Sequence, residues 1–235
     1  MTRDRSLSAL LCAAMSLCAF AASARAETFE DLRGGGVTLF LRHATAEWSD
    51  AGNEIGALDP ARLDTKACAS KRRLTEDGRL QARAIALALQ GLDLGPLDIH
   101  TAGLCRTFET ARTLGAAPRV VVALTPMQGQ VPSVRAQGEA IEKIVRAGQQ
   151  ARGLRVIIGD YEAIQALYGV TLSEGDGLVL KSVNDGAEPV ARIMAADWTS
   201  LQPFPRANAR GLRFGSFDSE VALSRAPAKA RRNPD

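Results

Sequence analysis

The chain has 235 residues, of which 46% are hydrophobic and 23% charged, with 29 basic and 26 acidic side chains. A chain of this length can bury one sizeable core, which favours a single domain. Three of the basic residues and one acidic residue lie in the first 26 positions, so the remainder carries a net charge of only +1. This balance excludes charge-driven nucleic-acid binding as the basis of function.

The first 26 residues have the pattern of a secretory signal peptide. Arg3 and Arg5 precede an apolar stretch at 7–22, and small residues at 24–26 suit signal peptidase. A membrane anchor is the alternative, but the stretch is short for a bilayer and no other long apolar run follows. Cys12 and Cys18 each follow leucine, which disfavours a lipoprotein signal. We therefore predict a periplasmic or secreted protein with no stable membrane insertion after cleavage.

The rest of the chain divides into a domain at 27–202 and a C-terminal extension at 203–235. The extension is rich in proline, arginine, alanine and serine without helical or strand periodicity, so its last residues are predicted to be disordered. Its basic residues leave a contact with anionic lipid or lipopolysaccharide open as a third reading of the tail, beside a simply solvated one.

Strands and helices alternate along the domain. Apolar runs at 37–41, 97–99, 120–122 and 156–158 predict strands, and apolar residues at helical spacing predict helices at 75–89, 105–114, 136–146 and 161–167. Residues 177–181 and 190–194 predict a closing strand pair. This order predicts an α/β, three-layer αβα sandwich with a mostly parallel central sheet. Its binding crevice would lie beyond the carboxyl ends of the strands.

Cleavage of the leader would leave two cysteines, Cys68 and Cys105. In an oxidising compartment a lone pair can form a disulfide. The bridge would close a loop of 37 residues and stabilise the fold by roughly 4 kcal/mol. Two free buried cysteines are the alternative, and we predict the bridge.

Two segments that follow predicted strands carry phosphate chemistry. Arg42 and His43 come directly after the first strand, where arginine can bind a phosphate dianion and neutral imidazole can attack phosphorus. Such a pair by itself is also typical of a surface without a function. Arg106 opens a helix after the second strand, and a helix N-terminus favours an anion.

Three motifs together resemble the histidine phosphatase superfamily in order and spacing: RHA at 42–44, RLTEDGR at 73–79 and CRTFETA at 105–111. The likeness runs from about residue 37 to 198. It is greatest to a secreted bacterial branch that includes lipopolysaccharide-core heptose phosphate phosphatases, whose cysteine positions also fit. The resemblance implies that His43 accepts the phosphoryl group and that Arg42, Arg106 and Thr101 surround the phosphoryl oxygens.

The sequence departs from this family at the second histidine, whose place is taken by Asp160. The only other histidine, His100, lies 60 residues upstream, and it could approach the phosphate or simply end its strand. Losing a donor to phosphate costs about 3–4 kcal/mol of barrier. An ionised aspartate would also repel the dianion, whereas a protonated one could donate a hydrogen bond or act as the acid.

The sequence offers three candidates for the general acid. Glu47 and Asp50 follow the nucleophile in the loop at 44–73, and Glu139 opens a later helix. Glu47 is the preferred candidate of the three, although each could be a solvated carboxylate. Cys105 and Arg112 do not make a cysteine-based phosphatase, because six residues separate them and that site requires five.

These observations predict an exported phosphomonoesterase-like protein that forms a phosphohistidine. The resemblance implies no metal and no cofactor, because arginines neutralise the charge. The partner would be a phosphorylated small molecule or envelope glycan. The alternative is a catalytically silent relative that binds a phosphorylated envelope ligand or a protein partner, and serious loss of phosphatase activity is favoured over full retention.

Overall fold

A computed structural model describes residues 32–33, 35–47, 68, 72–115, 117–125, 134–148, 153–184 and 186–200. All of them lie within the segment predicted as the domain. The predicted leader at 1–26 and the extension at 203–235 fall outside the described residues, as does most of the loop that follows the nucleophile.

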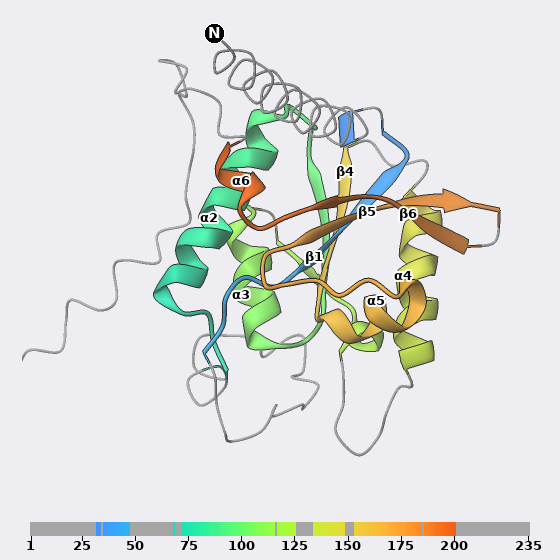
Figure 1. The fold of residues 1–235 in the computed structure, drawn as a ribbon, viewed down its shortest axis with the longest axis horizontal. Coiled ribbons are helices and arrows are strands. Elements are labelled where there is room, and N and C mark those ends of the chain that lie inside the picture. The colour runs from blue at the N-terminus through green and yellow to red at the C-terminus, as the bar shows by residue number, and fades with distance from the viewer. Residues whose placement is uncertain are drawn as a thin grey trace, which may run out of the picture. The chain divides into compact units, whose positions relative to one another are not determined.

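A six-stranded sheet forms the centre of the described part, in the spatial order β3–β2–β4–β1–β5–β6 (Figure 1). The first four strands of this order are parallel, whereas β5 runs antiparallel to β1 and β6 antiparallel to β5. The strands are β1 (Val37–Arg42), β2 (Leu97–Thr101), β3 (Arg119–Val120), β4 (Leu154–Gly159), β5 (Gly177–Val183) and β6 (Gly186–Ile193). The mostly parallel sheet predicted from the sequence is therefore confirmed.

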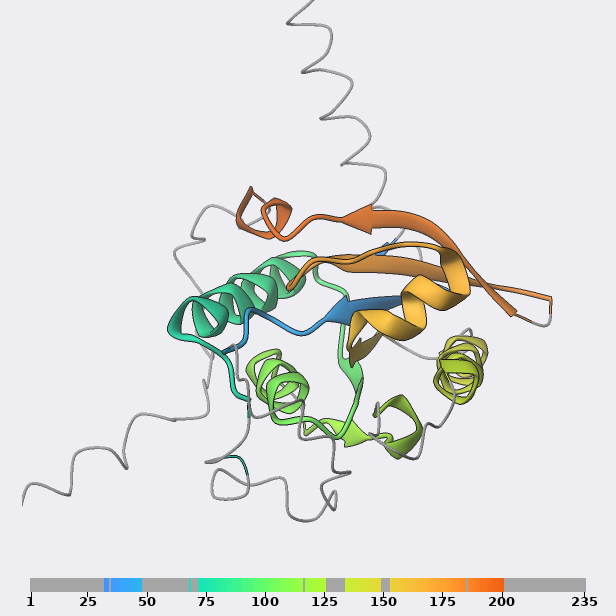
Figure 2. The ribbon, with the colours of Figure 1, turned by 60° about the horizontal axis from the view of Figure 1, so that its bottom comes forward.

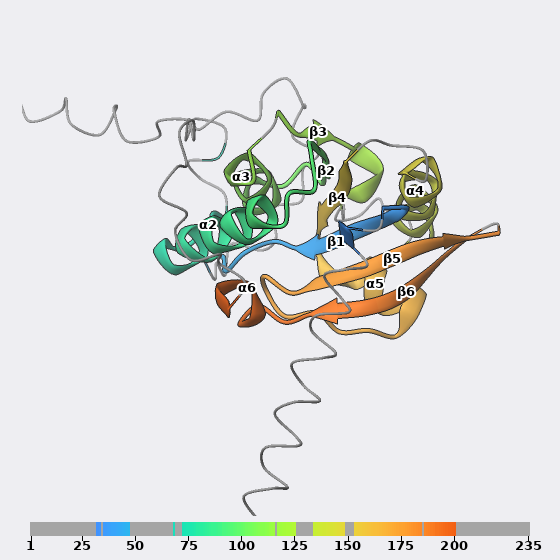
Figure 3. The ribbon, with the colours of Figure 1, turned by 90° about the horizontal axis from the view of Figure 1, so that it is seen from above.

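Helices cover both faces of the sheet and complete the three layers (Figures 2 and 3). One face packs against α2, α3 and α6, and the other against α4 and α5. The α-helices are α2 (Glu76–Gly91), α3 (Cys105–Thr113), α4 (Val134–Gly148), α5 (Tyr161–Tyr168) and α6 (Asp197–Ser200).

Strand β1 shows how the sequence builds two cores. Its side chains alternate across the sheet, so Leu39 and Leu41 enter the core beneath α2, and Phe40 enters the core beneath α4. All three are almost completely buried. A continuous apolar run is what a strand covered on both faces requires.

The motif at 73–79 docks α2 onto the segment that follows β1. Thr75 is the N-cap of α2, and its hydroxyl accepts a hydrogen bond from the Gly78 amide at 2.9 Å. The Gly78 Cα packs directly on the Thr45 carbonyl, because a Cβ there would lie 1.8 Å from that oxygen. Only glycine allows this approach.

The two edges of the sheet are short or irregular. At one edge β3 has two residues. At the other, β6 pairs with β5 through a register shift, in which Val179 faces Ala191 and Leu180 faces Pro189. Val190 is therefore an extra residue in β6 and is 41% exposed.

The predicted strand at 120–122 is wrong in its second half. β3 ends at Val120, and Val122–Leu124 forms a 3-10 helix. The reason is that β2 ends at Thr101, whose carbonyl accepts from the Val121 amide, so the neighbouring strand offers nothing further to pair with. The short helix α6 is not among the elements predicted from the sequence.

Candidate active site

The site lies at the carboxyl ends of the parallel strands β1, β2 and β4, where the residues that directly follow these strands lie close together. His43 follows β1, Ala102 follows β2 and Asp160 follows β4. Backbone hydrogen bonds join these ends, because the His43 amide donates to the Gly159 carbonyl and the Ala102 amide donates to the Ile158 carbonyl. The sheet thus brings together residues that are distant in sequence.

His43 is completely buried, and one hydrogen bond fixes its ring. Nδ1 lies 2.7 Å from the Ala44 carbonyl oxygen, which can only accept, so Nδ1 carries the hydrogen. Nε2 has no hydrogen-bond partner and lies 3.6 Å from Oδ2 of Asp160. In the neutral ring the free electron pair is therefore on Nε2, the nitrogen that faces Asp160.

Arg106 is the strongest partner of Asp160. It is the second residue of α3, is 3% exposed, and donates to Asp160 Oδ2 from Nη2 at 2.6 Å and from Nε at 3.3 Å. One carboxylate oxygen therefore lies within reach of both Arg106 and His43. Both are among the residues that the sequence assigns to phosphate.

Arg42 completes the cationic side of the site. Its Nη1 donates to the Leu172 carbonyl at 2.7 Å, and its guanidinium stacks over the Tyr161 ring at 4.7 Å. Its Nε is buried without a hydrogen-bond partner and lies 3.7 Å from Asp160 Oδ1. Arg42 Nε can thus donate to one further oxygen atom, whereas His43 Nε2 has an electron pair that no hydrogen bond uses.

Asp160 is held as an anion among these groups. It is the N-cap of α5, where Oδ1 accepts from the Tyr161 amide at 3.0 Å, and it is 8% exposed. Burial alone would raise the pKa of the carboxyl, but His43, when its ring is protonated, and Arg106 outweigh burial and hold that pKa well below its ordinary value. The structure therefore places a carboxylate against the phosphate-binding groups.

This lowered pKa predicts acid sensitivity of the fold. In the unfolded chain Asp160 takes up a proton near its ordinary pKa of about 3.9, whereas the folded chain resists protonation. Stability from Asp160 is thus fully present above that pH and is lost as the pH falls below it, by at most about 1.4 kcal/mol per pH unit. Urea unfolding at several pH values should show wild type losing stability more steeply than Asp160→Asn below about pH 4. A constant difference between the two curves would contradict this.

A second carboxylate, Glu174, borders the site and was missed by the sequence analysis. Its Oε1 lies 4.0 Å from His43 Nδ1 and from Arg42 Nη2, and pairs with Arg72 Nη2 at 3.0 Å. It belongs to the loop before β5. Because β5 is antiparallel to β1, this loop arrives at the carboxyl end of β1.

Hydrogen bonds anchor that loop to the nucleophile segment. The Gly175 amide donates to the His43 carbonyl, and the Trp198 indole donates to the Gly175 carbonyl at 2.8 Å. From α2, the Gln81 amide group accepts from the Thr45 amide and donates to the Glu174 carbonyl. His43 therefore has little freedom to move.

The motif at 105–111 supports the site from α3. The Thr107 hydroxyl donates to the Ala102 carbonyl at 2.7 Å, and the Thr110 hydroxyl accepts from the Ala44 amide at 3.1 Å. Glu109 accepts from Arg73 Nε at 2.6 Å and from the Leu74 amide at 2.9 Å. Glu109 and Thr110 thus bind α3 to the two other motifs, and Thr107 binds it to the residue that follows β2.

Glu162, in the first turn of α5, is a further carboxyl that the sequence analysis did not single out. It is half-buried, and its Oε2 is buried without a hydrogen-bond partner. Burial raises the pKa of this carboxyl, and the negative charge of Asp160 raises it further, against the opposing effects of Arg106 and Arg42. The sequence feature that could have indicated Glu162 is its position two residues after Asp160.

The remaining sequence candidates lie elsewhere or make local contacts. The Thr101 hydroxyl is buried and donates to the Ala102 carbonyl at 3.1 Å. Glu47 is exposed, and its backbone pairs with Arg73. Their predicted functions stay predictions. Asp50 lies outside the described residues, and Glu139 pairs with Arg135 at 2.9 Å on the exposed side of α4.

His100 belongs to a separate polar cluster on β2. Its Nε2 lies 3.3 Å from Asp98 Oδ2, which also binds Arg155 of β4 at 2.7 Å. Burial lowers the pKa of His100, although Asp98 opposes this. The contacts favour the prediction of an ordinary strand-end histidine over one that approaches phosphate.

The predicted disulfide between Cys68 and Cys105 is confirmed. The two Cα atoms lie 5.7 Å apart, and both side chains are buried against Phe108 and Val120. Cys105 is the first residue of α3 and directly precedes Arg106. The bridge therefore ties the loop to the helix end that holds the site arginine.

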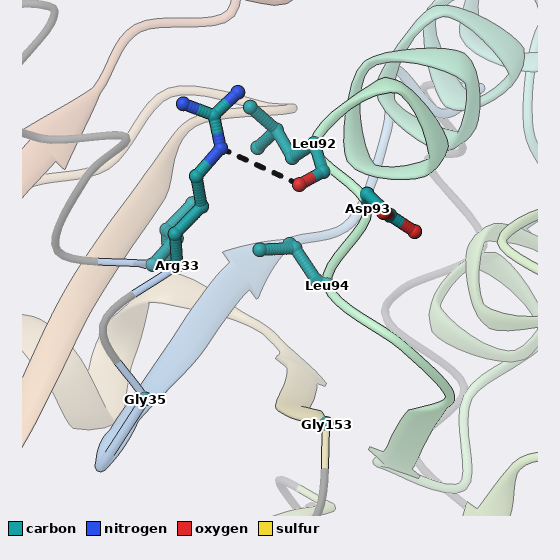
Figure 4. A pocket seen from close by; sticks show the side chains of 7 residues that line it. Arg33, Gly35, Leu92, Asp93, Leu94 and Gly153 are labelled. Atoms are coloured by element: carbon teal, nitrogen blue, oxygen red, sulfur yellow. Dashed lines mark hydrogen bonds between the residues drawn. The ribbon is translucent and has the colours of Figure 1, made fainter.

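A separate pocket of about 380 Å³ lies away from this site (Figure 4). It is lined by Leu32, Arg33, Gly35, Leu92, Asp93, Leu94 and Gly153. Arg33 reaches across it toward the Leu92 carbonyl oxygen, 3.4 Å from its Nε. Gly35 and Gly153 precede β1 and β4, so the pocket is at the amino ends of the parallel strands.

The described residues contain neither a membrane-spanning helix nor a cluster of metal ligands. No helix among them has both the length and the hydropathy that a bilayer crossing requires. Nor do their histidine, cysteine and carboxylate side chains form any group of three or more that could hold a metal ion.

Comparison with known proteins finds a family that matches part of the chain. Residues 38–127 match the family described as "Histidine phosphatase superfamily (branch 1)", and this segment contains all three motifs and both arginines of the site. The resemblance seen in the sequence is confirmed to this extent. No curated protein matches the chain significantly.

Three phosphatases are among the solved structures that match the chain. A phosphoserine phosphatase from Entamoeba histolytica is 11% identical, with a TM-score of 0.48, over 66% of this chain and 95% of its own. The protein histidine phosphatase SixA, complexed with tungstate, is 14% identical, with a TM-score of 0.49, over 68% and 98%. A mycobacterial glucosyl-3-phosphoglycerate phosphatase is 16% identical, with a TM-score of 0.44, over 66% and 97%.

Proposed function

With the match to the histidine phosphatase superfamily as the premise, we propose that this chain is an exported phosphatase-like protein for phosphate monoesters, whose turnover is suppressed by Asp160. The observation that carries the proposal is the position of one carboxylate oxygen. Asp160 Oδ2 lies 2.6 Å from Arg106 Nη2 and 3.6 Å from His43 Nε2. A phosphoryl oxygen that contacted both groups would need the same place.

The groups for phosphoryl transfer are otherwise assembled. His43 Nε2 has the free electron pair, its ring is fixed through Nδ1, and it would attack phosphorus to form a phosphohistidine. Arg42 and Arg106 would neutralise the phosphoryl oxygens, and Arg42 Nε already lacks a partner. Water would then release phosphate and restore His43.

Asp160 opposes this chemistry in two ways. It supplies no hydrogen to phosphate while it is ionised, and the loss of one such donor costs about 3–4 kcal/mol of barrier, or about 100- to 1000-fold in rate. Its charge also repels the dianion and occupies Arg106. A proton shared between Asp160 and His43 Nε2 would remove the electron pair that attacks phosphorus.

The same observation favours a second candidate, a catalytically silent relative. In that case the arginines and His43 would retain a phosphorylated envelope ligand, or a protein partner, without turnover. The two candidates share the fold and the site and differ only in whether the phosphoryl group reaches His43. Retention of an intact nucleophile and both arginines supports the enzyme, whereas the ionised Asp160 supports the silent protein.

Two features support a position outside the cytoplasm. The disulfide requires an oxidising compartment, such as the periplasm or the exterior. The pattern of the first 26 residues is that of a cleaved leader. The substrate class that fits this location is a phosphorylated small molecule or envelope glycan, and the likeness of the motifs to heptose phosphate phosphatases supports a phosphorylated sugar.

The proposal is tested with an aryl phosphate and with tungstate as a phosphate mimic. Wild type should show slow turnover that falls to background in His43→Ala and is kept in His100→Ala. These are the only two histidines in the chain, so His100 is the matched control. Tungstate binding without turnover would support the silent protein. Turnover that survives in His43→Ala, or the absence of both turnover and tungstate binding, would refute phosphate chemistry at this site.

A further inference from the structure

We propose that Glu162 is the general acid of this site, which gives its proton to the ester oxygen that leaves phosphorus. The inference rests on the proposed function, since it assigns a residue to that reaction. It replaces Glu47, the residue that the sequence favours for this step.

Glu162 is placed where an acid has to be. It stands in the first turn of α5, two residues after Asp160, at the helix end that faces the phosphate-binding groups. It interacts electrostatically with Asp160 of its own segment, with Arg106 of α3 and with Arg42 of β1. Of these three groups, Asp160 lies 3.6 Å from His43 Nε2, and both arginines lie within 4 Å of the Asp160 carboxylate.

One oxygen of Glu162 is also free to contact a ligand. Six buried side-chain atoms in the described part of the chain lack a hydrogen-bond partner, and three of these belong to the site: Arg42 Nε, His43 Nε2 and Glu162 Oε2. Buried polar atoms are seldom left without partners. A phosphate ester would supply oxygens to Arg42 and Glu162, and its phosphorus to His43.

The environment separates the two neighbouring carboxyls into different states. Asp160 is bound by Arg106 and stays ionised, whereas burial and the Asp160 charge favour the protonated form of Glu162. Two carboxyls whose surroundings push their pKa values apart are the usual sign of a division between acid and anion. Asp160 is thereby the anion and Glu162 the proton carrier.

Other carboxyls in the described part of the chain are less suited to this step. Glu174 is paired with Arg72 at 3.0 Å, and Glu109 is held by Arg73 and the Leu74 amide. Glu47 has an exposed position, where water would compete for its proton. Among the carboxyls that the structure describes, Glu162 alone combines a buried oxygen without a partner with a raised pKa.

Atoms and electrons balance in this reaction. His43 Nε2 uses its electron pair to form a bond to phosphorus, and the bond between phosphorus and the ester oxygen breaks. That oxygen takes both bonding electrons and the Glu162 proton, and it leaves as an alcohol. The Glu162 carboxylate then accepts a proton from the water that attacks the phosphohistidine, which yields phosphate and restores both residues.

The test compares leaving groups within one variant. A dinitrophenyl phosphate needs no proton on its leaving oxygen, whereas an alkyl phosphate does. Glu162→Gln should slow the alkyl ester by about 100-fold or more and leave the dinitrophenyl ester nearly unchanged. In a chain with Glu162, kcat should fall as the pH rises, because the acid loses its proton. This fall should be absent in Glu162→Gln. The readout is the ratio of the rates on the two substrates, and a partly unfolded preparation lowers both rates equally and leaves this ratio unchanged.

The assays are run in the wild-type chain and in the Asp160→His chain, which should turn over faster. Glu47→Gln tests the rival acid, and Glu188→Gln, an exposed position on β6, is the control. An equal loss on both esters in Glu162→Gln, or a selective loss on the alkyl ester in Glu47→Gln, would overturn the assignment alone. Absence of turnover in both chains on both esters would contradict the proposed function itself.

Discussion

Replacing Asp160 with histidine should raise the turnover of an aryl phosphate by about 100- to 1000-fold. The substitution removes the carboxylate that binds Arg106 and supplies an N–H donor to the phosphoryl oxygens. It also removes the anion that lies 3.6 Å from His43 Nε2. Loss of the N-cap hydrogen bond to Tyr161 should cost about 1 kcal/mol of stability, which the fold tolerates. The measurement is kcat on an aryl phosphate.

Two further variants separate the causes of this gain. Asp160→Asn removes the charge but not the N-cap, so a partial gain there would assign that part to electrostatic repulsion. The double variant with His43→Ala should lose the whole gain, because the attack still requires Nε2. If Asp160→His is as inactive as wild type although folded, Asp160 is not what suppresses turnover.

Removal of the disulfide should lower the free energy of unfolding by about 4 kcal/mol. The bridge joins positions separated by 37 residues, and closing a loop of that length restricts the unfolded chain. The variant is Cys68→Ser with Cys105→Ser, compared with wild type by urea unfolding. Tungstate affinity should fall as well, since Cys105 precedes Arg106 at the start of α3.

The reductant provides the control for this prediction. Wild type treated with a reductant should approach the stability of the double variant, and the double variant itself should not respond. A loss of less than about 1 kcal/mol would show that the loop is already restricted in the unfolded chain. An unchanged affinity for tungstate would show that α3 holds Arg106 without the bridge.

The convergence of His43, Arg42, Arg106 and Asp160 was predictable because it depends on a regular property of parallel sheets. Each of these residues lies within a few positions of a strand end, and apolar runs identify such strands. The disulfide was predictable from the cysteine count. Substitution of Asp160 for a histidine is visible in the sequence, but its ionisation is not, because it depends on burial and on Arg106.

The rest of the site depends on contacts that have no local pattern. Glu174 reaches His43 because β5 pairs antiparallel with β1, and a short loop with Gly175 leaves no signal of that pairing. Glu162 carries no signal except its nearness to Asp160. The end of β3 at Val120 is likewise decided by the length of its neighbour β2, whereas the valine run itself favours a longer strand.

The irregular sheet edges have a consequence for the behaviour of the protein in solution. An open edge strand offers unpaired amides and carbonyls that can recruit another chain into a shared sheet. On β6 the proline at 189 has no amide hydrogen and the extra residue at 190 bends the strand, while β3 at the opposite edge is only two residues long. The folded domain is thereby protected against growth of its sheet by copies of itself, which matters wherever it accumulates at high concentration.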